Sequence, residues 1–167
     1  MNKILLALAL LTSVSFAQSS STQSTGIYLG AGAGIMAIND KEGDFGLAMS
    51  LRGGMALNHI LKGFGVQIEL NNSLIDPETR NNIDIDVMTM ALYTTYDISI
   101  PNSGVKLRPK IGAILPNMKD DIDSRDLILS SGFGMTYGLR KDLRLYADYT
   151  VLGSGVSNYS AGLEFKF

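Results

Sequence analysis

The chain has 167 residues, enough for one domain, and its 46% apolar and 18% charged residues argue against a disordered protein. It contains no Cys, which excludes disulfides, thiolate nucleophiles and cysteine-ligated zinc. Its 14 Lys and Arg against 16 Asp and Glu lack the basic excess of a nucleic-acid-binding protein, so no nucleic-acid partner is expected.

The first seventeen residues have the pattern of a secretory signal peptide. A positive start at Lys3 is followed by the apolar run 4–11, and small residues precede a cleavage site after Ala17. The apolar stretch is shorter than the roughly 20 residues that a membrane-spanning helix needs. We therefore expect residues 1–17 to be a signal for Sec-type export, 18–25 a polar leader and 26–167 a single domain.

From Gly26 onward, apolar and polar residues alternate, which is the period of a β-strand with two different faces. Eight such segments are predicted: 26–37, 45–57, 64–71, 83–96, 105–115, 127–139, 143–151 and 159–167. Seven connections rich in turn-forming residues join them: 38–44, 58–63, 75–82, 97–103, 116–126, 140–142 and 152–157. Eight consecutive strands predict an all-β fold, an eight-stranded antiparallel up-and-down barrel.

Two places disturb this pattern. In the fourth segment, Met88, Met90 and Leu92 make both faces apolar, so we expect a bulge that changes the strand register there. Pro109 lies inside the fifth segment, although proline cannot donate to a strand ladder and avoids central strands. A second local bulge is expected at this proline.

The composition of the polar face indicates which side of the barrel points outward. This face is rich in Gly, Ala and Ser, which leave room inside a narrow barrel for long side chains. Its charges are nearly balanced, as a buried network requires because each unpaired charge is costly. We predict a charge network in the lumen formed by Arg52, Glu69, Asp84, Asp86, Lys106, Arg108, Lys110, Arg144, Asp148 and Glu164.

The aromatic residues of the apolar face gather near the two ends of the predicted strands. Such belts are typical of a barrel that spans a membrane, where aromatic side chains lie at the two interfaces. The predicted girdle consists of Phe45, Phe64, Tyr93, Tyr137 and Tyr149. We therefore favour a transmembrane barrel over a soluble exported barrel that binds an apolar ligand.

The last segment carries a recognisable signature. Tyr159, Ser160, Gly162, Phe165 and Phe167 resemble the C-terminal assembly signal of bacterial outer-membrane β-barrel proteins. The chain is also similar in length and layout to small eight-stranded barrels of the OmpX/NspA/OmpA-transmembrane type. This resemblance implies localisation in the outer membrane and insertion by the barrel-assembly machinery.

The same resemblance places the connections 38–44, 75–82, 116–126 and 152–157 outside the cell. The first three carry nine acidic and four basic residues, a net charge of 4 − 9 = −5. Besides membrane lipid, lipopolysaccharide bridged by divalent ions is the expected surface contact, and any protein partner is unknown. Asp120, Asp121 and Asp123 are a candidate site for weak Ca²⁺ or Mg²⁺ binding.

Signals for catalysis or a bound cofactor are weak. The glycines at 30, 32 and 34 lack the third glycine and the following helix of a dinucleotide-binding loop. The single histidine, His59, lies in a predicted turn without the partners of a catalytic or metal site. We expect neither a cofactor nor an enzymatic activity.

Two roles are therefore considered for the barrel. One is a structural or surface-interaction role, which a lumen filled by side chains favours. The alternative is a narrow ion-conducting pore with a preference for anions, lined by Lys106, Arg108 and Lys110.

Overall fold

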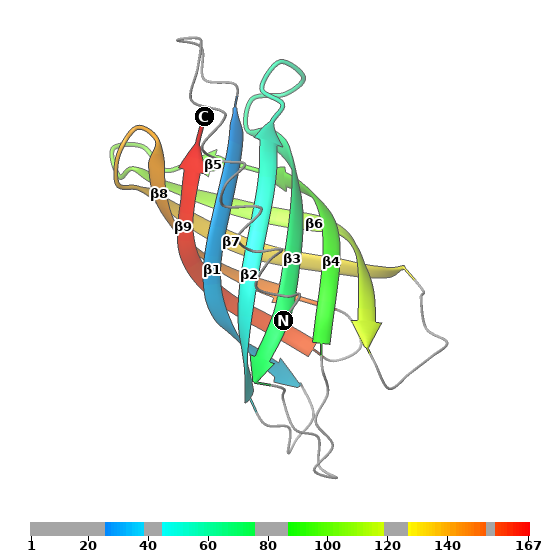
Figure 1. Cartoon of the computed structure of the whole chain (residues 1–167). Helices are drawn as coiled ribbons and strands as arrows, with labels where there is room; N and C mark the ends of the chain where they lie inside the picture. Colours follow the sequence, from blue (N-terminus) through cyan, green and yellow to red (C-terminus); the bar gives the residue numbers. More distant parts are fainter. Residues whose placement is uncertain (1–25, 39–44, 76–86, 119–126, 153–155) are drawn as a thin grey trace.

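The computed structural model of the chain describes residues 26–38, 45–75, 87–118, 127–152 and 156–167 (Figure 1). The predicted signal and leader lie outside these residues, as do Asp84, Asp86, Asp120, Asp121 and Asp123. The described strands are β1 (Ile27–Ile38), β2 (Phe45–Ala56), β3 (Phe64–Ile75), β4 (Val87–Tyr96), β5 (Ile98–Ser99), β6 (Val105–Met118), β7 (Ile128–Gly138), β8 (Leu143–Val151) and β9 (Val156–Lys166). Across the described ranges, no helix has the length and apolar character needed to cross a membrane.

The described strands close into the eight-stranded antiparallel barrel that the alternation predicts (Figure 1). Consecutive strands pair with one another, except β4 and β5, which both pair with β6. The barrel closes between β1 and β9, which pair from Tyr28 opposite Lys166 to Ile38 opposite Val156. We call the end at which β9 finishes the C-terminal end, and the opposite one the loop end.

β4 and β5 are two parts of one strand, interrupted at Asp97. Both pair with β6 in the same register, but the ladder is absent between them, beside Pro109. Because proline has no N–H to donate, it is accommodated where a ladder is interrupted. On its other side Pro109 stays opposite Phe133 with no register shift. The bulge expected at Pro109 is therefore wrong, and a gap in one ladder takes its place.

The register change expected in the fourth segment is also absent from β4. This strand pairs without a shift with both neighbours, and Met88, Met90 and Leu92 all point outward. A bulge occurs instead near the end of β3, where the register with β2 shifts by one residue. The successive side chains of Leu74 and Ile75 are both exposed there, as expected when an extra residue breaks the alternation.

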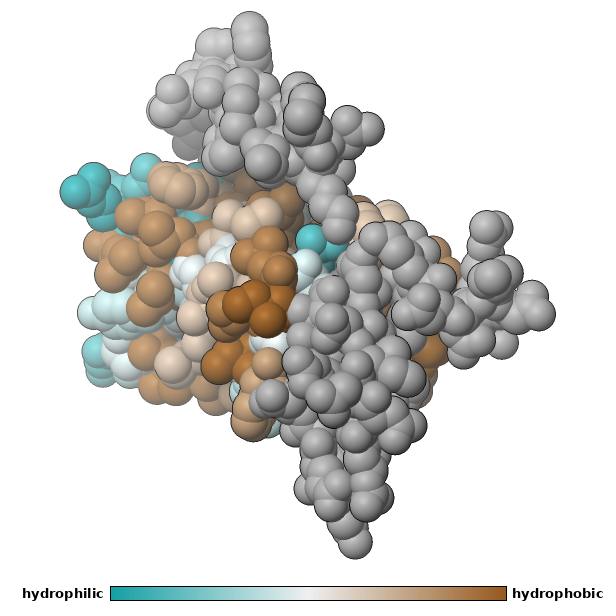
Figure 2. Space-filling view, turned by 60° about the horizontal axis from the view of Figure 1, so that its bottom comes forward, coloured by the Kyte–Doolittle hydropathy of each residue, from teal (hydrophilic) through white to brown (hydrophobic). Residues whose placement is uncertain are grey.

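The exterior of the barrel is apolar. Leu, Ile, Met and aromatic side chains are exposed on its strands, and Figure 2 shows brown side chains over much of the visible wall. Of the predicted girdle, Phe45, Tyr137 and Tyr149 are exposed and Phe64 is half-buried. Tyr93 is only 1% exposed, so its assignment to the girdle is wrong. The reason is the register of β4, which turns Met90 and Leu92 outward and Tyr93 into the lumen.

Candidate functional site in the barrel lumen

The inward face of the barrel carries charged side chains that are almost wholly buried. Six members of the predicted network lie here, from β2, β3, β6, β8 and β9: Arg52, Glu69, Arg108, Lys110, Asp148 and Glu164. Because a buried charge without a partner is costly, the contacts of each group decide whether this arrangement is stable.

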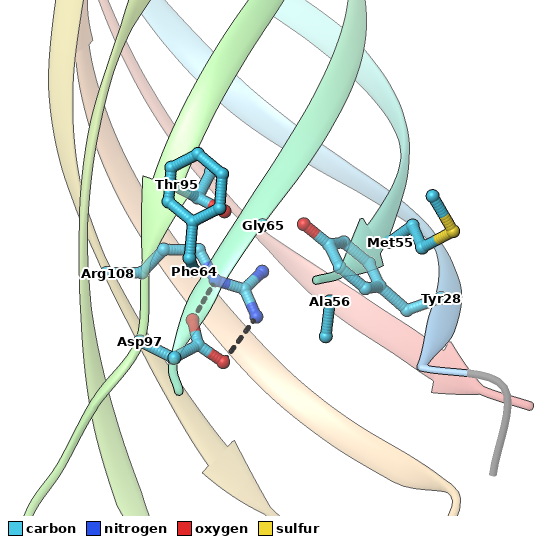
Figure 3. Close-up of a pocket in the computed structure, with 9 residues that line it drawn as sticks. Tyr28, Met55, Ala56, Phe64, Gly65, Thr95, Asp97 and Arg108 are labelled. Carbon is cyan, nitrogen blue, oxygen red and sulfur yellow. Dashed lines mark hydrogen bonds and ion pairs between the residues drawn. The ribbon is translucent and has the colours of Figure 1, made fainter. Parts of the chain in front are cut away.

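Arg108 is the most connected cation of the lumen. Its Nε donates to Asp97 Oδ1 at 2.7 Å and its Nη2 to Asp97 Oδ2 at 3.3 Å, a two-point contact seen in Figure 3. Its Nη1 donates to Glu164 Oε2 at 3.0 Å. Arg108 therefore ties β6 to β9 across the lumen and to the residue that separates β4 from β5.

A second set of contacts joins the remaining buried charges. Arg52 Nη1 lies 2.7 Å from Asp148 Oδ2, and Arg52 Nη2 lies 3.2 Å from Glu164 Oε2. Lys110 Nζ lies 3.1 Å from Asp148 Oδ2 and also pairs with Glu69. The strands that these contacts join are not neighbours in the barrel, so the ion pairs cross the lumen.

Two further cations lie at the C-terminal edge of this network. Arg144 Nη1 is 3.4 Å from Glu164 Oε1, and the more exposed Lys106 has its Nζ 3.5 Å from Asp97 Oδ2. With them, the network holds five cations and four carboxylates among the described residues, a net charge of 5 − 4 = +1: Arg52, Lys106, Arg108, Lys110 and Arg144 against Glu69, Asp97, Asp148 and Glu164. The structure thus brings together the eight predicted members that it describes. Asp97 was missed because the pattern placed it in a connection.

Three tyrosines, which the charge pattern alone did not assign to the network, pack against its cations. The guanidinium carbon of Arg52 lies 3.2 Å from the centroid of the Tyr146 ring, and that of Arg108 lies 4.7 Å from the centroid of Tyr28. Lys110 Nζ lies 4.9 Å from the ring centroid of Tyr93. A cation over an aromatic face is stabilised by the ring quadrupole, more so when both are desolvated.

Glycines on the inner face make room for these rings. A Cβ at Gly54 would collide with the Tyr28 ring, and one at Gly32 with the Tyr146 hydroxyl. The glycines at 30, 32 and 34 therefore lie in β1 as inner-wall residues that leave space for neighbouring side chains, which is the lumen role that the sequence indicates for them. A signal for two of the tyrosines was present, since Tyr28 shares the parity of the glycines in β1 and Tyr146 that of Arg144 and Asp148 in β8.

The lumen changes character toward the loop end. Asn158 Nδ2 donates to Asn71 Oδ1 at 3.2 Å, and Asn71 Nδ2 donates to Thr89 Oγ1 at 3.3 Å. Around them lies a buried apolar cluster of Met36, Ala48, Ala91, Tyr93, Ile114, Leu152 and Val156. We call this region the neutral half of the lumen, and the region of the four carboxylates and their cations the ionic half.

Among the described residues, the space left at the C-terminal end of the lumen is small. A recess at the C-terminal end, lined in part by Tyr28, Asp97 and Arg108, has a cavity volume of about 10 Å³, the room of one water (Figure 3). His59 is exposed in the turn between β2 and β3. Among the described residues, no group of His, Cys, Asp or Glu side chains is arranged to hold a metal ion.

A closed barrel with an apolar exterior and an ionic interior defines the class of transmembrane β-barrels, in which lipid replaces water around the wall. The family model described as outer membrane protein beta-barrel domain matches residues 5–167. The chain belongs to this family of outer-membrane β-barrel proteins. The prediction of a small outer-membrane barrel is thereby confirmed.

Solved structures of the same fold are similar at low sequence identity. The neisserial surface protein A has 18% identity and a TM-score of 0.60, covering 87% of this chain and 99% of that one. Ail, the attachment invasion locus protein of Yersinia pestis, has 15% identity and a TM-score of 0.59, covering 87% and 100%. The N-terminal barrel domain of Pseudomonas aeruginosa OprF has 14% identity and a TM-score of 0.58, covering 87% and 100%. No curated protein sequence matches the chain.

Proposed function

We propose that this outer-membrane barrel has a structural or surface-interaction role, does not conduct ions and carries no enzymatic activity. The observation that supports this is the network of ion pairs across the lumen. Arg52, Arg108 and Lys110 each contact carboxylates on strands that are not their neighbours. To pass an ion, the barrel would have to separate these buried pairs, and breaking one is strongly unfavourable.

The alternative, a narrow anion-preferring pore, would need free cations along the lumen. Lys106, Arg108 and Lys110 do lie on one strand, β6, as that hypothesis requires. Each of the three, however, contacts at least one carboxylate. Cations that are paired in this way attract a passing anion only weakly, because the carboxylate partner offsets the electric field of each cation.

The alternative of a soluble barrel around an apolar ligand is opposed by the same geometry. Such a protein would line its interior with apolar residues and expose polar ones. In this chain, Ile68, Leu92 and Leu129 are exposed, whereas Arg52 and Glu164 are buried. The exterior therefore suits lipid, and the interior holds charges.

Planar-bilayer recording of the refolded full chain tests the proposal. We expect no steady conductance from the natural sequence, because the ionic half blocks the lumen. A Lys110→Ala variant, which shortens a side chain at the centre of the network, is expected to show conductance steps. Met49→Ala is the matched control, since Met49 is exposed on the outer face of β2 and its loss leaves the lumen filled.

Steady conductance by the natural sequence, lost when Lys106, Arg108 and Lys110 are neutralised, would favour the pore instead. Enzymatic activity is tested separately with lipid and peptide substrates offered to the folded protein. Hydrolysis that disappears on replacing a single side chain would contradict the absence of catalysis.

The C-terminal segment supports a further part of the proposal, recognition by the barrel-assembly machinery. Tyr159 and Phe165 are exposed on the outer face of β9, whereas Ser160 and Gly162 lie on its inner face. We expect Phe167→Ala to reduce the amount of folded protein in the outer membrane, measured by the shift in gel mobility on boiling. Unchanged assembly of this variant would contradict the signal.

A further inference from the structure

The C-terminal end of the barrel carries three exposed cations in two turns. Lys62 lies in the turn between β2 and β3, and Arg140 and Lys141 lie in the turn between β7 and β8. We call these three residues the basic rim. Within the described part of the chain none of them forms an ion pair, unlike the cations of the lumen, and Asp142 is the one carboxylate in the same turns.

Each part of the basic rim directly follows exposed apolar side chains. Leu61 precedes Lys62 and is 53% exposed, and Leu139 precedes Arg140 and is 49% exposed. Both pairs lie in turns just beyond the ends of the strands, so these cations are at the C-terminal edge of the apolar exterior. That is the level of lipid headgroups, where long basic side chains reach the interface while their aliphatic stems stay against apolar surface.

The two parts of the rim are on opposite sides of the barrel. In the order of strands around the wall, the β2–β3 turn and the β7–β8 turn are separated by half of the ring (Figure 1). A single protein partner would have to span the barrel to meet both. Lipid headgroups surround the barrel on all sides, so they reach both turns without any such bridge.

The opposite end of the exterior has the reverse charge in the sequence. Aspartate directly flanks the terminal exposed apolar residue of three strand ends at the loop end: Asp44 before Phe45, Asp76 after Ile75 and Asp126 before Leu127. Along the sequence, the exposed apolar wall therefore adjoins acid residues at the loop end and basic residues at the C-terminal end. This difference in charge favours anionic headgroups in the leaflet at the C-terminal end over anionic headgroups in the opposite leaflet.

We propose that the basic rim binds anionic phospholipid headgroups in the leaflet that surrounds the C-terminal end. The phosphate-bearing, net-negative headgroup meets Lys62 on one side of the barrel and Arg140 with Lys141 on the other, while the acyl chains contact the adjacent apolar wall. Near an anionic membrane surface, each cation is expected to strengthen binding about five-fold at low ionic strength.

Native mass spectrometry of the refolded full chain tests this proposal. The protein in neutral detergent is offered equal amounts of phosphatidylglycerol and phosphatidylcholine with identical acyl chains, and the bound lipids are counted. We expect the natural sequence to retain phosphatidylglycerol several-fold over phosphatidylcholine. The variant Lys62→Gln/Arg140→Gln/Lys141→Gln is expected to bind the two lipids nearly equally.

A matched control removes the same number of positive charges from the connections of the loop end. Lys41→Gln/Arg80→Gln/Lys119→Gln changes the net charge by the same amount and leaves the rim intact. This variant is expected to keep the preference for phosphatidylglycerol. Equal loss in both variants would attribute the preference to net charge and overturn the proposal, as would an undiminished preference in the rim variant.

Two further measurements serve as controls, one for folding and charge and one for the kind of anion that is bound. The shift in gel mobility on boiling reports whether each variant folds, and Arg140→Lys/Lys141→Arg, which keeps both charges, is expected to retain the preference. Inorganic phosphate, compared with chloride at the same ionic strength, is expected not to displace phosphatidylglycerol, because phosphate has no acyl chains to contact the wall. Displacement by phosphate would show a site for free anions and overturn the assignment to lipid.

Discussion

The two halves of the lumen fill the same barrel with different chemistry. In the ionic half, Arg108 and Glu164 form an ion pair across the lumen between strands that are not neighbours. In the neutral half, amide and hydroxyl groups bond to one another beside an apolar cluster that includes Met36 and Ile114. The comparison shows that a barrel lumen can be filled without charged side chains. The need to fill space therefore does not by itself explain the ionic half.

The stability of the two halves is expected to respond differently to loss of a side chain. In the ionic half, the carboxylates Asp97, Asp148 and Glu164 each contact more than one cation, so a single deletion removes one partner from two or more cations. In the neutral half, a deletion leaves an empty volume but no uncompensated charge. The cost of stranding a buried charge exceeds that of a small cavity, and this difference can be measured.

The largest effect is expected from Asp148→Asn. The change leaves Arg52 and Lys110 with one fewer carboxylate in a desolvated site, and removing one partner of a buried ion pair costs about 3–5 kcal/mol. The free energy of unfolding is measured by urea titration of the protein in lipid vesicles. Asp142→Asn, in an exposed turn, is the control and is expected to stay within about 0.5 kcal/mol of the natural sequence. Equal stability of the two variants would show that the network contributes little.

A smaller effect is expected from Met36→Ala in the neutral half. Met36 is fully buried, and truncating a buried methionine costs about 2–4 kcal/mol because a cavity remains. Met49→Ala removes the same atoms from the exterior of β2, where lipid chains fill the gap, and is expected to cost less than half as much. The same urea titration gives both values. A greater loss from Met49→Ala would indicate that the exterior, rather than the lumen, holds the tighter packing.

Most of the ionic half was predictable because charge and parity agree in the sequence. Arg52 and Glu69 occupy the polar face of clearly alternating segments, and the structure pairs both with partners across the lumen. Alternation fixes the side of the wall on which a residue lies, but it contains no information on which residues meet across the lumen. That depends on the stagger of the closed sheet, which brings Arg108 to Glu164 from distant parts of the chain.

The errors arose where the local pattern was ambiguous. Tyr93 lies in a segment that is apolar on both faces, so parity could not assign it, and pairing with β3 and β6 fixes its direction. Asp97 was placed in a connection because it follows the last clear alternation, yet β5 continues the strand beyond it. Pro109 suggested an extra residue, whereas the interrupted ladder beside it needs none.

Tyr93 lies at the boundary of the two halves and provides the finest test of where they meet. Its hydroxyl lies 2.9 Å from Ser130 Oγ, its ring contacts Lys110, and it also belongs to the apolar cluster. Tyr93→Phe keeps the ring and removes only the hydroxyl, so we expect a loss of about 0.5–1.5 kcal/mol, the value of one buried hydrogen bond.

Tyr137→Phe makes the same chemical change on the lipid-facing side of β7 and is the matched control. Its cost is expected to be smaller than that of Tyr93→Phe, because no hydrogen bond to a buried partner is lost. If urea titration gave the reverse order, Tyr93 would belong to the exterior and the register of β4 would be wrong. A larger loss for Tyr93→Phe than for Tyr137→Phe would mean that the Tyr93 side chain makes both a polar and an apolar contact in the lumen. The change from ionic to neutral packing would then lie at the level of the Tyr93 ring.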